Sequence, residues 1–293
     1  MKIIAGAFID SSKINIEEFF ENFKTYIFEV DKAIIYDFHK EVNNEIKERI
    51  ENNFIVQFEK EIEYLNVIDY GEAENYHKFL ETAAKEKYQY ALIMESGYYY
   101  EEDNFKELVN YLKNTKDENI SVLTPFPLYT CMKIEERDQE YREIKGAHLV
   151  GTLINVDHYA KIGPFKLEYY QGYVDYEYCL RVRLAGNKVV LANHLYIWNQ
   201  NFNLIERTIM LQKFSTYEKP IKELYYETRN RHYLWKEYQG IDDEYVKADK
   251  RSFKREVREI KFIDPQYELK REVIRQAKRD YRKNIKYKSD MFK

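Results

Sequence analysis

The chain has 293 residues, 44% of them hydrophobic, and a formal net charge of −4 at pH 7. This length and apolar content suffice for one large domain, or for one domain with an appendage. No apolar run approaches the roughly 20 residues that cross a bilayer, and the first residues lack a signal-peptide cleavage pattern, so we expect a soluble, cytoplasmic protein.

Cysteine and histidine usage argues against disulfide and zinc chemistry. Cys131 and Cys179 are the only cysteines, and their spacing fits neither a metal site nor a redox motif, so we expect both thiols to be reduced. The six histidines are scattered and form no HExxH pair or Cys/His cluster.

In the first part of the chain, short apolar runs alternate with amphipathic segments, as in a βαβ sheet. The pattern predicts strands at 2–9, 32–36, 54–58 and 89–94, and helices at 16–28, 44–50 and 74–87. Acids follow the strand regions at Asp37, Asp69 and Glu95. Ligands of open α/β sheets bind outside the carboxyl ends of strands, so these acids are either site residues or ordinary loop residues.

Two common nucleotide-binding fingerprints do not occur. No Gly-x-Gly-x-x-Gly follows the first predicted strand, and the chain contains no Walker lysine loop. A dinucleotide-binding or P-loop enzyme is therefore disfavoured.

The second part of the chain predicts fewer strands and ends in helices. We expect a strand at 121–124, an irregular stretch around Pro125 and Pro127, a strand at 148–156, a short helix at 157–162, and strand segments at 188–195 and 198–199. Beyond this point the pattern is purely helical, with a helix at 221–238 and two charged amphipathic segments divided near Pro265.

Residues 172–190 predict a short helix, closed by Gly186, and a strand after it. On a helical wheel Asp175 shares the apolar face with Tyr178, Cys179 and Val182, whereas Glu177 faces Arg181 four residues later. A carboxylate in the position of Asp175 is either an N-cap or a base that faces a cleft.

In their order along the chain, four motifs resemble those of family 2 inverting glycosyltransferases of the GT-A fold, most closely the rhamnosyltransferase-like branch. The motifs are Leu149-Val-Gly-Thr-Leu-Ile154, Ile162-Gly-Pro-Phe165, Tyr173-Val-Asp-Tyr-Glu-Tyr-Cys-Leu-Arg181 and Tyr225-Tyr-Glu-Thr-Arg-Asn230. Weaker matches are Ile34-Ile-Tyr-Asp37 and Gly71. The resemblance implies an α/β fold with a Rossmann-like mixed sheet flanked by helices and a C-terminal helical appendage.

The resemblance also implies an activity. A nucleotide-diphosphate sugar would be the donor, and a hydroxyl of a glycan or lipid-linked acceptor would attack it with inversion. Asp175 would be the general base. Residues on the donor side would be Phe8, Asp37, Gly71, Glu95, Gly97 and Arg229, and residues on the acceptor side would be Gly151, Thr152 and Glu177. Arg229 and Glu177 have structural alternatives as a packing residue and as a helix partner of Arg181.

The metal signature of the family is altered in this chain. Where the family has Asp-x-Asp, the sequence has Glu95-Ser96-Gly97, and Asn199 stands where many relatives have a metal-binding histidine. Glu95 supplies one hard oxygen ligand for Mn²⁺ or Mg²⁺, but Gly97 supplies none. We expect weak metal binding by Glu95; the alternatives are basic side chains in place of the metal, or a non-catalytic glycosyltransferase-like binding or scaffold protein.

The C-terminal segment differs from the rest in charge. Residues 245–293 contain 17 Lys and Arg and 8 Asp and Glu, an excess of nine, while the rest of the chain has 13 more acidic than basic residues. We expect a transferase domain at 1–238 and a basic amphipathic extension at 239–293. The extension either rests on an anionic membrane surface or packs on the domain or another subunit, and no motif indicates nucleic-acid binding.

Overall fold

The computed structural model describes residues 1–101, 103–129, 137–138, 140–201, 204–209 and 211–292, so Cys131 lies outside the described residues. The chain forms two compact units. The sheet unit comprises Met1–Tyr70, Asn75–Pro164 and Tyr178–Asn201, and the helical unit comprises Gly71–Glu74, Phe165–Glu177 and Phe202–Lys293.

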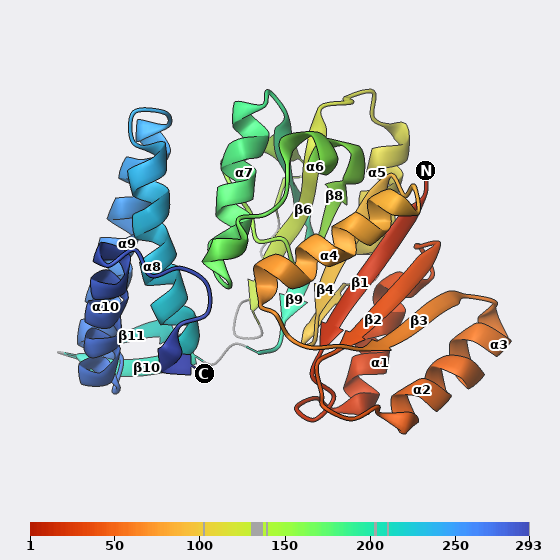
Figure 1. Cartoon of the computed structure of the whole chain (residues 1–293), viewed down its shortest axis with the longest axis horizontal. Helices are drawn as coiled ribbons and strands as arrows, with labels where there is room; N and C mark the ends of the chain where they lie inside the picture. The colour runs from red at the N-terminus through yellow and green to blue at the C-terminus, as the bar shows by residue number, and fades with distance from the viewer. Residues whose placement is uncertain (102, 130–136, 139, 202–203, 210, 293) are drawn as a thin grey trace. The chain divides into compact units, whose positions relative to one another are not determined.

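The sheet unit contains a mixed sheet (Figure 1). Its described strands are β1 (Ile3–Ile9), β2 (Lys32–Asp37), β3 (Glu61–Asn66), β4 (Tyr90–Glu95), β5 (Tyr98–Tyr100), β6 (Ile120–Tyr129), β7 (Tyr141–Glu143), β8 (Thr152–Asn155) and β9 (Lys188–Asn199). The order is β3-β2-β1-β4-β8-β6-β9-β5, and β7 also pairs with β9. Strands β1 to β4 are parallel, and β8 is antiparallel to both of its neighbours.

Helices cover both faces of this sheet. The helices of the first 201 residues are α1 (Ile16–Ile27), α2 (Asn44–Ile50), a π-helical turn (Glu51–Ile55), α3 (Val56–Phe58), α4 (Glu72–Lys85), α5 (Asn104–Asn114), α6 (Val156–Ile162), a 3₁₀ turn (Leu167–Tyr169) and α7 (Val174–Leu184). Of these, the 3₁₀ turn and the starts of α4 and α7 belong to the helical unit. Alternate residues of β1, from Ile3 to Ile9, pack in one core with α1 and α5. The opposite face of β1 meets α4 closely, because a Cβ on Gly6 would lie 2.9 Å from the Phe79 ring.

Most predicted elements of this unit are confirmed, but the predicted strand at 54–58 is wrong. There α2 continues through the π-helical turn into α3, which buries Phe54 in the core and leaves Val56 exposed. The strand is β3, which begins at Glu61, three residues after the predicted strand ends. Its residues Glu61 and Glu63 form ion pairs with Lys32 of β2, and such charges at a sheet edge hide the apolar alternation of a strand.

The predicted irregular stretch around Pro125 and Pro127 lies within β6. A register shift between Pro125 and Phe126 interrupts the pairing with β9, as proline in a sheet requires. The two strand segments predicted after Gly186 form one continuous strand, β9.

The helical unit contains a hairpin as well as helices. Its elements after residue 201 are β10 (Leu204–Ile209), β11 (Gln212–Tyr217), α8 (Ile221–Tyr238), α9 (Asp243–Ile263), α10 (Tyr267–Arg282) and a 3₁₀ turn (Asp290–Phe292). The helices share a core that includes Tyr225 and Phe253, and Pro265 separates α9 from α10 as predicted. The expectation of a purely helical C-terminal part is wrong because of the hairpin, which is too exposed to show an apolar face.

In the part of the chain that the structure describes, no helix combines the length and the apolar character needed to cross a membrane.

Candidate functional site

The first group of candidate residues lies at the carboxyl ends of the parallel strands. Phe8 of β1 is in register with Tyr36 of β2 and with Glu95 of β4, and the next residue of β1 is in register with Asp37. Asp37 and Glu95 therefore flank the end of β1 at one edge of the sheet, about 10 Å apart at the usual strand spacing. As predicted, Asp37 and Glu95 stand at the ends of strands, whereas Asp69 lies three residues beyond the end of β3.

Asp37 is fully buried and holds three chain segments together. Its Oδ1 accepts hydrogen bonds from the backbone N–H groups of Ser11 and His39, both at 3.0 Å, and its Oδ2 accepts one from the Tyr64 hydroxyl at 2.5 Å. Burial and the neighbouring carboxylate raise the pKa of Tyr64 to about 12. The two oxygens are thus held in a fixed orientation by donors from three strand ends.

Glu95 and the turn after it form the next part of this edge. Glu95 Oε1 accepts a hydrogen bond from the Tyr76 hydroxyl at 2.6 Å. Gly97 has φ +82°, and a Cβ there would lie 2.3 Å from the Asn201 side-chain amide. That amide donates to the Ser96 carbonyl at 2.7 Å. The turn therefore needs glycine at position 97 both for its backbone conformation and for its contact with Asn201.

Phe8 belongs to an aromatic cluster on the α4 side of the sheet. Its ring stacks on Tyr36 with centroids 5.0 Å apart and meets Phe79 edge to face at 6.0 Å. Only 4% of Phe8 is exposed, so the described contacts of this predicted donor-side residue are packing contacts.

Gly151 and Thr152 also make internal contacts. Gly151 has φ +72°, and a Cβ there would overlap the Ile197 side chain at 1.9 Å. Its carbonyl accepts a hydrogen bond from the Tyr100 hydroxyl at 2.7 Å. Thr152 is fully buried, with its hydroxyl 2.9 Å from the His148 carbonyl oxygen.

The strand-end residues do not fit a conventional divalent-cation site. Glu95 is the only carboxylate in the Glu95-Ser96-Gly97 turn, and the Asn199 side-chain oxygen accepts from the Asn201 N–H at 2.8 Å. Over the described ranges, no three His, Cys, Asp or Glu side chains are grouped so that they could hold a metal ion. Hard cations take several oxygen ligands, so one carboxylate needs help from a substrate.

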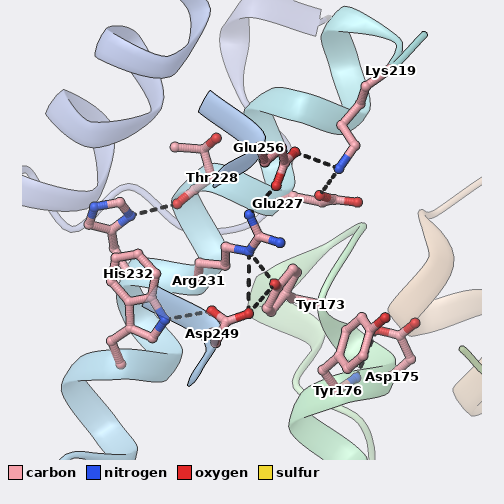
Figure 2. Close-up of polar contacts among 11 residues, drawn as sticks. Tyr173, Asp175, Tyr176, Lys219, Glu227, Thr228, Arg231, His232, Asp249 and Glu256 are labelled. Atoms are coloured by element: carbon pink, nitrogen blue, oxygen red, sulfur yellow. Dashed lines mark hydrogen bonds and ion pairs between the residues drawn. The ribbon is translucent and has the colours of Figure 1, made fainter. Parts of the chain in front are cut away.

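The second group of candidate residues lies in the helical unit, at the start of α7. The Tyr173 carbonyl accepts the first bond of the helix, from the Glu177 N–H at 3.1 Å, which makes Tyr173 the N-cap. Asp175 is thus inside the first turn rather than at the N-cap position, but it still satisfies a free backbone N–H group of that turn, as the capping alternative expects. Its Oδ1 accepts from the Tyr176 N–H at 2.8 Å, and only 4% of the residue is exposed (Figure 2).

The segment before α7 has an unusual backbone. Tyr170, Gly172 and Tyr173 all have positive φ, between 64° and 68°. The Asn230 side-chain amide of α8 donates to the carbonyl oxygens of Tyr169, Gln171 and Gly172, at 2.8 to 3.0 Å. Such a backbone persists only where its surroundings hold it, and Asn230 supplies that restraint.

Arg229 supports the same segment from inside the core. It is fully buried and donates to the Tyr169 carbonyl at 3.0 Å and to the Tyr287 carbonyl at 2.8 Å. Its guanidinium also lies 4.9 Å from the centroid of the Tyr226 ring. These internal contacts agree with the alternative that Arg229 is a packing residue. Its role in binding the leaving group stays a prediction.

Figure 2 shows a buried charge network beside this segment, centred on Arg231. Arg231 donates to the Tyr173 hydroxyl and to Glu256, and it lies 3.6 Å from Asp249. Burial opposes its charge, but Tyr173, Glu256 and Asp249 outweigh burial and raise the pKa of the guanidinium. The network ties α8 and α9 to the residue that caps α7.

Lys219 extends this network at its other end. Its ammonium group lies 2.5 Å from Glu227 and 2.7 Å from Glu256. Burial alone would raise the pKa of the Glu256 carboxyl, but Lys219 and Arg231 hold it down, at about 2.

Glu177 is fully buried in the helical unit. Its Oε1 accepts a hydrogen bond from the Tyr238 hydroxyl at 2.6 Å and lies 3.5 Å from the Lys166 ammonium group. Arg181 donates to the carbonyls of Gly163 and Pro164 at 3.0 and 2.9 Å, so it fixes the Gly-Pro-Phe turn.

Gly71 belongs to the helical unit, as does Arg229, whereas the other predicted donor-side residues belong to the sheet unit. It has φ +95°, and a Cβ there would lie 2.5 Å from the Tyr170 ring. One residue later, Glu72 accepts a hydrogen bond from the Gly172 N–H at 2.7 Å. Gly71 and Glu72 thus help to hold the segment that leads to Asp175.

The sequence did not identify the residues that orient the candidates. Tyr64 and Tyr76 bind the two strand-end acids, and Asn230 and Arg231 hold the backbone before α7. The only signal was the run of polar residues on the buried face of α8, where Glu227 and Arg231 are four residues apart.

Comparisons with known proteins bear on the fold. No protein-family model matches the sequence, and no curated protein matches it. Several solved structures do. S. aureus TarS is 12% identical, with a TM-score of 0.52 over 94% of this chain and 43% of that one. The chain thus spans less than half the length of that TarS chain.

Two further solved structures carry nucleotides or nucleotide sugars. GalNAc-T7 with UDP, GalNAc and Mn²⁺ is 10% identical, with a TM-score of 0.58 over 97% of this chain and 56% of that one. A mannosyltransferase from Pyrobaculum calidifontis with GDP-Man and Mn²⁺ is 9% identical, with a TM-score of 0.52 over 78% of this chain and 61% of that one. The chain therefore has a GT-A-type fold with helices at its C-terminal end.

Proposed function

We propose that the protein is a glycosyltransferase that moves a sugar from a nucleotide-diphosphate donor to a hydroxyl group of a glycan or lipid-linked acceptor. The observation that carries this proposal is the shared fold with the mannosyltransferase bound to GDP-Man and with GalNAc-T7 bound to UDP. The acids at one edge of the sheet support it, since ligands of such sheets bind there.

In the proposed reaction Asp175 is the general base. It takes the proton of the acceptor hydroxyl while that oxygen attacks the anomeric carbon, and the nucleotide diphosphate leaves from the opposite face with inversion. The support for this role is the resemblance of residues 173–181 to the motif in which the family carries its base. The family 2 and rhamnosyltransferase-like assignment belongs to the same proposal.

The other residue roles remain part of the proposal. The donor-side roles of Asp37 and Glu95 are supported by their position at the carboxyl ends of the two strands next to β1. The internal contacts of Phe8, Gly151 and Thr152 favour roles in shaping the sheet around a ligand. No step is assigned to a metal ion, and a need for Mn²⁺ would appear as a difference in donor hydrolysis with and without this ion.

The proposal also includes the organisation of the chain. We assign the transferase domain to residues 1–238 and a basic extension to 239–293, at the cytoplasmic face of a membrane, with no role in nucleic-acid binding.

The test compares the wild type with Asp175→Asn in donor hydrolysis, with and without Mn²⁺, over a panel of UDP and GDP sugars. Removing a general base lowers turnover by about 10²- to 10⁴-fold. Donor affinity, measured by calorimetry, should not change. Asp157→Asn is a matched control, since Asp157 is an exposed carboxylate in the first turn of α6, and it should keep full turnover.

Two outcomes would contradict the proposal in different ways. Turnover that survives Asp175→Asn would remove Asp175 as the base. Donor binding without turnover by the wild type, at any Mn²⁺ concentration, would support the alternative of a non-catalytic binding or scaffold protein, which the altered Asp-x-Asp position suggests.

A further inference from the structure

Helix α9 carries a stripe of basic side chains along its outer face. The basic stripe consists of Lys247, Arg251, Lys254, Arg258 and Lys261, and all five are exposed. Their spacing of four, three, four and three residues places them within about 80° of the helix circumference, at 100° per residue. The stripe is about 21 Å long, at 1.5 Å per residue. This helix face therefore presents a straight row of positive charge.

The basic stripe lacks acidic partners among the described residues. Across the part of the chain that the structure describes, none of the five side chains forms an ion pair. Other basic residues of the C-terminal helices are paired, for example Lys270 with Asp264 and Arg275 with Glu272. The opposite face of α9 packs into the core through Phe253 and Ile260.

Large apolar side chains are exposed next to the C-terminal end of the stripe. Phe262 follows Lys261 and is 53% exposed, and the Lys261 ammonium group lies 5.3 Å from the centroid of its ring. The hairpin meets α9 at the same place, because Arg207 of β10 donates to the Phe262 carbonyl at 2.9 Å. Leu211, which follows β10, is 99% exposed. Exposed apolar side chains thus occur next to the stripe, at Phe262, and at the tip of the hairpin that contacts α9, at Leu211.

We propose that the basic stripe, with Phe262 and Leu211, is a docking surface for an anionic lipid bilayer. Lysine and arginine bind anionic headgroups, while exposed leucine and phenylalanine enter the boundary between headgroups and acyl chains. A soluble polyanion would use the charges but would leave the apolar side chains in water. The combination therefore fits a lipid surface better than a nucleic acid.

The acidic excess of the remaining chain determines which part of the protein faces the membrane. Residues 1–244 have 13 more acidic than basic residues, so an anionic membrane repels them and attracts only the C-terminal segment. The protein docks through α9, with the stripe parallel to the surface. Only the reason for docking, access to a lipid-linked acceptor, rests on the proposed function.

The experiment measures co-sedimentation of the whole protein with phosphatidylcholine vesicles, with and without phosphatidylglycerol. The test variant is Arg251→Glu with Arg258→Glu, two exposed stripe residues seven positions apart. The matched control is Lys106→Glu with Lys113→Glu, which have the same spacing and exposure on α5 of the sheet unit. Each basic residue near the surface contributes about a five-fold increase in affinity. We therefore expect the stripe variant to bind phosphatidylglycerol vesicles about 25-fold more weakly, or worse, and the control to bind like the wild type.

A second measurement tests the apolar part of the surface. Leu211→Trp should show a blue shift of its fluorescence on phosphatidylglycerol vesicles, whereas Leu184→Trp, at a 53% exposed position of α7, should not. Wild-type binding that is equal with and without phosphatidylglycerol overturns the proposal. So does stripe-dependent binding to a duplex oligonucleotide that matches or exceeds binding to the vesicles.

The outcome is independent of catalysis. Donor hydrolysis without vesicles should be the same in the stripe variant and in the wild type. Vesicle binding by a protein without transferase activity would contradict the proposed function alone, and full hydrolysis without vesicle binding would contradict this inference alone.

Discussion

The guanidinium of Arg231, on α8, donates a hydrogen bond to the hydroxyl of Tyr173, two residues before Asp175. The same hydroxyl lies 2.6 Å from Asp249 Oδ1 on α9. A tyrosine with φ +64° is thus fixed by two helices that come later in the chain. Because α7 begins directly after Tyr173, the direction of its first turn depends on the contacts of one phenol group.

Tyr173→Phe tests that dependence. The substitution removes the hydroxyl and leaves a buried guanidinium and a buried carboxylate without one partner each, which destabilises the protein by about 1–3 kcal/mol. Urea unfolding measures this loss. If Asp175 is the base, kcat should fall while the donor KM stays the same, because only the base is displaced.

Tyr287→Phe is the control for that measurement. Tyr287 is 60% exposed, so loss of its hydroxyl should change neither stability nor turnover. Equal stability and equal kcat for Tyr173→Phe and the wild type would show that the phenol does not hold α7.

The pKa of Glu256 predicts a loss of stability in acid. The folded protein holds this pKa at about 2, below its ordinary value of 4.5. The network therefore stabilises the fold above about pH 5, and this contribution disappears as the pH falls toward 2, to an extent on the order of 3 kcal/mol. Urea unfolding at several pH values should show a steeper acid loss for the wild type than for Glu256→Gln.

Glu118→Gln serves as the comparison for the acid experiment, since Glu118 is an exposed loop carboxylate. It should follow the pH dependence of the wild type. Parallel curves for the wild type and Glu256→Gln would mean that Lys219 and Arg231 do not stabilise the ionised Glu256.

Asn230→Ala tests the restraint on the backbone before α7. The substitution leaves three carbonyl groups without their common donor, and we expect a destabilisation of about 2–4 kcal/mol. Hydrogen exchange should also become faster at residues 169–173. Asn114→Ala, at the exposed end of α5, should have little effect on either measurement. Unchanged exchange at 169–173 would show that the segment keeps its conformation without the amide.

Two glycines with similar backbone angles allow the cost of a positive φ to be measured apart from the cost of a steric clash at Cβ. Gly97 has φ +82° and Gly186 has φ +79°, but a Cβ meets the Asn201 amide at 2.3 Å in the first case and nothing within 4 Å in the second. Gly186→Ala should cost about 1 kcal/mol, the price of the backbone conformation alone. Gly97→Ala should cost more and should release Asn201 from Ser96. Equal melting shifts for the two variants would show that the turn accommodates the methyl group.

Strands β1, β2 and β4 and most helices could be predicted because their apolar periodicity agrees with their burial. Residues 54–58 could not, because Val56 and Phe58 are apolar but exposed, and the pattern therefore indicated a strand. Strand β3 and the hairpin were missed for the opposite reason. Glu61 and Glu63 are charged residues in a strand, and β11 is exposed along most of its length.

For the candidate site, the sequence indicated which acids follow strands, and the register confirms that Asp37 and Glu95 share an edge. It did not indicate their partners. Tyr64 and Tyr76 are 2 of 29 tyrosines, and no local pattern distinguishes them from the rest. The roles of Asn230 and Arg231 arise from contacts across about 60 residues, which spacing along one helix does not reveal.

The charged outer strand β3 has a consequence for how the protein behaves at high concentration. Beyond β3 no described strand completes the sheet, so its backbone N–H and C=O groups could pair with a strand from a second molecule. The charges of Glu61 and Glu63 disfavour such pairing, and ion pairs with Lys32 hold both carboxylates beside β2. Replacing both glutamates with threonine would leave an uncharged edge strand that can pair with another molecule. The variant should therefore aggregate at high concentration before it loses its fold.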